Sequence, residues 1–66
     1  MSQYSNEELL EALRAITSTI SKLQKVEPKL RVGTSQHTLV IRRIKALQIS
    51  SDLIIQAIDK LQSPSN

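Results

Sequence analysis

One ten-residue segment decides the fold: VEPKLRVGTS, residues 26–35. Pro28 has no N–H to donate, and its ring would clash with the carbonyl four residues earlier, so we expect a preceding helix to end where this segment begins. Gly33 is the only glycine of the chain and predicts a turn with a positive φ angle or a helix C-cap. Thr34 or Ser35 is then the N-cap of a second helix.

Helical patterns lie on both sides of this segment. Upstream, Ser5 and Glu8 have the spacing of a capping box, in which each side chain accepts a hydrogen bond from the other residue's backbone N–H. Leucine or isoleucine then recurs in steps of four and three, at positions 9, 13, 16, 20 and 23. These positions cover about 80° of the helix surface, a narrow seam of the coiled-coil kind. We therefore predict one domain over 1–62, with a helix over 5–26, a connector over 27–34 and a helix over 35–62, and a disordered tail over 63–66.

The second helix is apolar over a much wider surface than the first. Its seam has the same spacing, and further aliphatic residues widen the apolar sector to about 240°. A partner with a narrow seam cannot cover that sector, so a second contact surface is required. We predict an all-α, antiparallel two-helix hairpin that dimerises into a four-helix bundle. The predicted dimer interface is Leu39, Leu47, Leu53, Ile54, Ile55, Ile58 and Leu61. Ile58 and Leu61 are expected to project beyond the first helix and to be bare in a monomer.

The composition excludes several classes of protein. Hydrophobic residues make up 39% of the 66 residues, but the chain has no cysteine, which excludes a disulfide-stapled fold, a cysteine zinc site and a cysteine nucleophile. No apolar run exceeds three residues, too few to span a membrane. The N-terminus has no basic and apolar regions typical of a signal peptide, so we expect a cytoplasmic protein that does not bind membranes.

No pattern in the chain is typical of an enzyme or a metalloprotein. There is no Ser–His–acid spacing and no glycine-rich phosphate loop. His37 is the only histidine, and one imidazole without thiolates is poor zinc chemistry. We therefore expect no catalytic residue, no cofactor and no metal. His37 is interpreted as a boundary residue of the second helix that hydrogen-bonds the connector near Glu27.

Charge is distributed unevenly along the sequence. The formal net charge is +3, yet no acidic residue lies between Pro28 and Ser51. That stretch holds five of the nine basic residues, namely Lys29, Arg31, Arg42, Arg43 and Lys45. Such a stripe is a candidate contact for an anion or a nucleic acid. The modest net charge, the lack of aromatic residues that stack on bases and the lack of a helix-turn-helix pattern favour a solvated face instead.

Three strings resemble a group of short uncharacterised bacterial proteins: EELLEALRAI at 7–16, GTSQHTL at 33–39 and RIKAL at 43–47. The resemblance spans most of the chain, and it implies a cytoplasmic helical protein with no known activity. From the residues themselves we interpret the chain as a small non-enzymatic protein-interaction or regulatory module that acts as a homodimeric helical bundle and binds an unidentified protein partner. The alternative is a nucleic-acid-binding regulator that uses the basic residues of 29–45.

Overall fold

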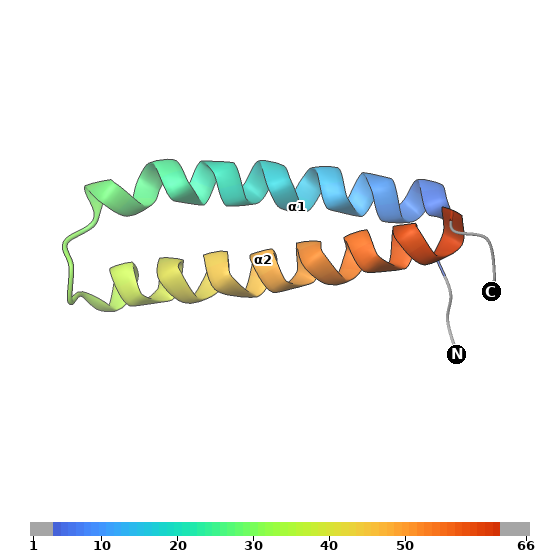
Figure 1. The fold of residues 1–66 in the computed structure, drawn as a ribbon. Coiled ribbons are helices and arrows are strands. Elements are labelled where there is room, and N and C mark those ends of the chain that lie inside the picture. The colour runs from blue at the N-terminus through green and yellow to red at the C-terminus, as the bar shows by residue number, and fades with distance from the viewer. Residues whose placement is uncertain (1–3, 63–66) are drawn as a thin grey trace.

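The computed structural model of the chain describes residues 4–62, and the predicted tail at 63–66 lies outside this range. It contains helix α1 (Asn6–Val26), a short 3₁₀ helix η1 (Glu27–Lys29) and helix α2 (Ser35–Gln62). The two long helices run side by side in opposite directions and form a rod of 49 × 20 × 16 Å (Figure 1). The predicted all-α antiparallel hairpin is confirmed. Neither helix is both long and apolar enough to cross a membrane within the described residues.

Helix α1 begins with the predicted capping box. The Ser5 hydroxyl accepts a hydrogen bond from the Glu8 N–H at 3.0 Å, and the Glu8 carboxylate accepts one from the Ser5 N–H at 2.9 Å. Two of the N–H groups that a helix leaves without an internal partner are thereby satisfied. Glu7 and Glu8 also place negative charge at the positive end of the helix dipole, and Lys25 lies at the other end.

Helix α1 ends at Val26, two residues before Pro28, as predicted. The chain does not become irregular there, because η1 adds a further helical turn. Pro28 occupies one of the first two positions of η1, where its missing N–H leaves no bond unmade. The Leu30 N–H then donates to the Glu27 carbonyl at 3.1 Å and closes the turn. No pattern in the sequence predicts this element.

The connector reverses the chain at Gly33, whose φ of +92° is the predicted left-handed conformation. Thr34 is the N-cap of α2, since its hydroxyl accepts from the His37 N–H at 3.2 Å. The same hydroxyl donates to the Arg31 carbonyl at 2.8 Å, which ties the connector to the new helix. Of the two predicted caps, Thr34 rather than Ser35 makes the bond.

The core of the hairpin consists of the contact between the α1 seam and the α2 seam. Among residues 4–62 only Ile44 and Ile58 are buried, each with 9% of its surface exposed. Half-buried residues occupy the predicted seam positions of both helices: 9, 13, 16, 20 and 23 on α1, and 40, 47, 51 and 54 on α2. The two seams therefore face each other, as the spacing predicts.

The expectation that Ile58 would project beyond α1 is wrong, because Ile58 is one of the two most buried side chains. The added turn of η1 lengthens the first arm of the hairpin, and the start of α1 lies level with the end of α2 (Figure 1). Leu61 does remain exposed, at 56%. The hairpin thus covers all but the last turn of the α2 seam.

Candidate functional site

The most unusual feature of the molecule is the apolar surface that α2 leaves uncovered. Helix α1 has two large hydrophobic residues exposed, Leu10 and Val26, each at 42%. Helix α2 has six, between 43% and 58% exposed: Leu39, Ile41, Ile49, Leu53, Ile55 and Leu61. The chain exposes 5495 Å² in all, against about 4,200 Å² for a globular chain of 7.4 kDa. A single hairpin therefore exposes more surface than a compact globular chain of the same mass.

The structure divides the predicted dimer-interface residues into two groups. Leu39, Leu53, Ile55 and Leu61 are exposed and available to another chain. Leu47 and Ile54 are half-buried, and Ile58 is buried, at the seam positions that face α1. Any contact between two hairpins therefore has to be made by the first group and its exposed neighbours.

Helix α2 has a second regular pattern outside its seam, which we call the Leu39 stripe. It consists of Leu39, Arg43, Ala46, Ser50, Leu53 and Ala57. Its steps of 4, 3, 4, 3 and 4 repeat the α2 seam one residue earlier along the chain, so the stripe is rotated by about 100° from the seam. The aliphatic residues alone predict one wide apolar sector. The offset of one residue is the signal that distinguishes the stripe from the seam that contacts α1.

The corresponding positions of α1 lie on the same side of the hairpin. Positions that precede the α1 seam by one residue are Glu8, Ala12, Ala15, Thr19 and Lys22. Because the helices are antiparallel and both right-handed, the two sets of positions share one broad face, which we call the alanine face. It holds all four alanines of the chain. Small side chains permit close approach of a further helix layer, since interaxial distance depends on side-chain size.

The hydroxyl groups on the alanine face are satisfied within their own helices. The Ser50 hydroxyl donates to the Ala46 carbonyl at 3.0 Å, and the Thr19 hydroxyl donates to the Ala15 carbonyl at 2.8 Å. Neither group needs water as a hydrogen-bond acceptor, so covering this face would leave neither hydroxyl proton without a partner. The opposite face exposes Leu10, Ile41 and Ile55, but it has no alanine and carries four charged residues, Arg14, Lys45, Asp52 and Asp59, against three on the alanine face.

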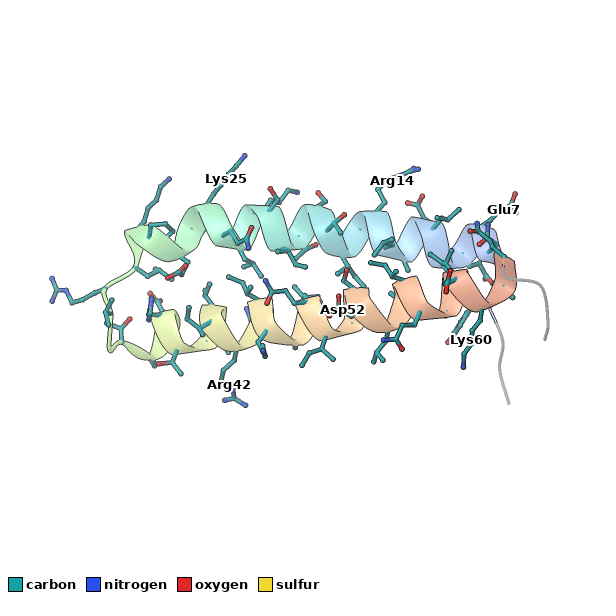
Figure 2. The ribbon with its side chains drawn as sticks, in the orientation of Figure 1. Glu7, Arg14, Lys25, Arg42, Asp52 and Lys60 are labelled. Atoms are coloured by element: carbon teal, nitrogen blue, oxygen red, sulfur yellow. The ribbon has the colours of Figure 1, made fainter. Side chains whose placement is uncertain are left out.

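The five predicted basic contacts are all exposed, but the fold does not bring them to one surface. Lys29 and Arg31 belong to the turn between the helices, whereas Arg42 points into solvent from the outer side of α2 (Figure 2). Arg43 lies on the Leu39 stripe and Lys45 on the opposite face. They share one end of the rod rather than one face.

His37 contacts the connector as predicted. Its Nε2 atom lies 3.3 Å from a carboxylate oxygen of Glu27, and both side chains are half-buried. This contact spans ten residues and helps to hold the turn between α1 and α2. In the part of the chain that the structure describes, no three potential metal-ligating side chains are grouped to hold an ion.

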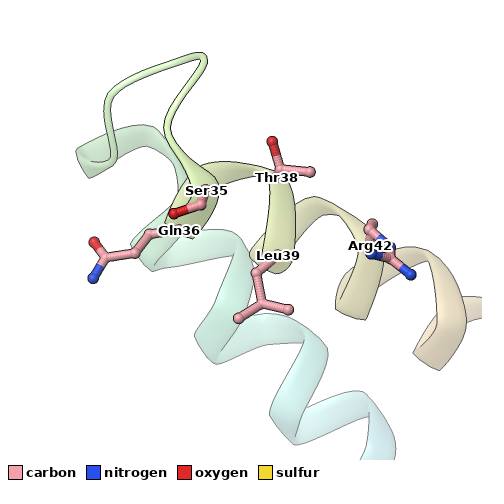
Figure 3. A pocket seen from close by; sticks show the side chains of 5 residues that line it. All are labelled: Ser35, Gln36, Thr38, Leu39 and Arg42. Carbon is pink, nitrogen blue, oxygen red and sulfur yellow. The ribbon is translucent and has the colours of Figure 1, made fainter.

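A hollow lies beside the first turns of α2 (Figure 3). It is lined by Ser35, Gln36, Thr38, Leu39 and Arg42. Leu39 is its one aliphatic side chain, and the other four offer hydroxyl, amide and guanidinium groups. This hollow therefore adjoins the connector end of the Leu39 stripe.

No family model, no curated protein and no solved structure matches the chain. The resemblance to short bacterial proteins thus stays a prediction. What the structure shows is a two-helix hairpin of 66 residues with an extensive uncovered apolar surface.

Proposed function

We propose that the chain is a small non-enzymatic protein-interaction or regulatory module that acts as a homodimer, with two hairpins forming a four-helix bundle. The observation that supports it best is the contrast on α2, where six large hydrophobic side chains are exposed and only two are buried. Full burial of one Leu or Ile side chain contributes about 1.5–3 kcal/mol, so covering the exposed Leu39 and Leu53 on both copies favours association.

The size of the uncovered surface suits a second copy. A face of 49 by 20 Å offers about 1,000 Å², and a standard interface buries about 800 Å² on each partner. A twofold dimer is also the commonest closed assembly, and it covers the same surface on both chains at once. One partner of the module is therefore the chain itself. The unidentified protein partner would bind the surface that the bundle leaves exposed.

Sedimentation equilibrium at micromolar concentration tests the proposal. We expect a mass twice that of the 7.4 kDa chain. Leu53→Lys should convert the protein into a monomer, because Leu53 is 58% exposed on the Leu39 stripe and an ammonium group there would be desolvated by dimerisation. The matched control is Ile49→Lys, at a residue that is 50% exposed but lies away from the stripe, and it should leave the dimer intact. A helical wild-type chain that sediments as a monomer overturns the proposal.

The second candidate function is nucleic-acid binding, favoured by the concentration of basic residues near the connector. Fluorescence anisotropy with labelled duplex and single-stranded DNA tests it. Binding that weakens steeply as salt is raised, and that is lost when Lys29 and Arg31 are replaced by glutamine, would support this function. Lys60→Gln is the matched control, since Lys60 lies at the far end of α2. Equal anisotropy with and without the protein at low salt would exclude it.

A further inference from the structure

Charge is distributed unevenly along the length of the hairpin. The half that contains the connector, residues 17–48, carries seven basic residues and one acidic residue, a net charge of +6. The other half, residues 4–16 and 49–62, carries five acidic and two basic residues, a net charge of −3. The fold creates this division, because it brings Glu7, Glu8 and Glu11 to the same half of the rod as Asp52 and Asp59. The chain is thus a rod of 49 Å with a basic and an acidic end.

We propose that the second copy packs antiparallel to the first, alanine face against alanine face, with the basic end of each rod beside the acidic end of the other. This inference rests on the proposed homodimer and specifies its geometry. The twofold axis is perpendicular to the rods, and α2 lies on the α2 of the partner copy.

Charge complementarity selects this arrangement over the alternative. A twofold axis along the rods would place α2 on the partner's α1 and would bring two ends of +6 together. The antiparallel arrangement instead sets +6 beside −3 at both ends. Single exposed ion pairs contribute only about 0.2–1 kcal/mol and are screened over about 8 Å at physiological salt, so these charges determine orientation more than affinity.

The side chains of the Leu39 stripe also fit the antiparallel register. Alignment about residue 48, the middle of both the stripe and α2, gives complete overlap of the two α2 helices. Leu39 of one copy then lies opposite Ala57 of the other, and Ala46 lies opposite Ser50. Leu39 thus meets a small side chain, and Ala46 and Ser50 are both small, which permits close approach of the two α2 helices near their middle. Arg43 lies opposite Leu53, along which its methylene groups can pack while its guanidinium reaches solvent at the edge.

Distances between spin labels in the dimer test the orientation, and the lack of native cysteine makes single-site labelling clean. Val32→Cys places the label on the connector, at a residue that is 80% exposed and off the alanine face. Pulsed electron paramagnetic resonance should then report a distance close to the 49 Å length of the rod. Gln48→Cys, at an exposed position at the middle of α2, should report a distance below half of that length.

The two labels separate failure of the orientation from failure of the dimer. A short distance at both Val32→Cys and Gln48→Cys would mean a dimer with like ends together, and it would overturn the antiparallel arrangement alone. No distance between chains at either site, in protein that is still helical by circular dichroism, would overturn the homodimer and this inference together.

Discussion

The two helices differ in how much of their apolar surface the hairpin covers. Helix α1 has one narrow seam, which faces α2, and its outer surface carries a guanidinium, carboxylates, ammonium groups and hydroxyls. Helix α2 has the same kind of seam and, one residue earlier at each step, the Leu39 stripe. The two helices therefore differ outside the seam, since α2 exposes six large hydrophobic side chains and α1 exposes two.

The largest effect should come from the seam that the two helices share. Ile44→Ala removes one of the two buried side chains and should lower the free energy of unfolding by about 2–4 kcal/mol. Ile49→Ala, at a half-exposed residue away from the seam, is the control and should change it by less than about 0.5 kcal/mol. Urea denaturation followed by circular dichroism measures both. Equal losses for the two variants would show that the seam is not the core.

A smaller effect is expected at the start of α1, where the helix depends on its own cap. Ser5→Ala removes the hydroxyl that accepts from the Glu8 N–H and should cost about 1 kcal/mol. Ser18→Ala, at an exposed position inside the same helix, is the matched control and should have little effect or be slightly stabilising, since alanine has the higher helix propensity. Thermal unfolding measured at one fixed protein concentration compares them. If Ser18→Ala is as harmful as Ser5→Ala, the cap has no special role.

The smallest effect should be found on the outer surface of α1. Glu11 and Arg14 form an ion pair at 3.4 Å, but their side chains are 72% and 78% exposed. Glu11→Gln should therefore change the free energy of unfolding by no more than about 0.5 kcal/mol, and by less still in high salt. Urea titrations at two salt concentrations measure this. A salt-independent loss above 1 kcal/mol, in the range of a buried interaction, would contradict the exposure of this ion pair on the outer surface of α1.

Features that depend on neighbouring residues could be predicted from the sequence. The capping box of Ser5 and Glu8, the helix end before Pro28 and the left-handed Gly33 each follow from the chemistry of a few adjacent positions. The contact of His37 with Glu27 could also be predicted, because the hairpin brings the start of α2 beside the end of α1.

Features that depend on length and relative placement were harder to predict. The sequence does not predict the burial of Ile58, because that burial depends on η1, which lengthens the first arm of the hairpin. With only three residues, η1 is too short to show a periodic pattern. The Leu39 stripe is not evident from the aliphatic residues alone, because an arginine and a serine occupy two of its six positions. The basic and acidic ends depend on the fold itself, since the acidic residues of the two helices that share the acidic end are 41 to 52 residues apart in the sequence.

Both ends of the described chain lie at the same pole of the rod, opposite the turn that holds Gly33 (Figure 1). A domain or reporter fused before Tyr4 or after Gln62 would therefore sit on that pole and leave the Gly33 turn unobstructed. In the antiparallel dimer, the two fused domains would lie at opposite ends, separated by roughly the length of one hairpin. The assembly would then work as a short spacer that holds two attached units at a set separation.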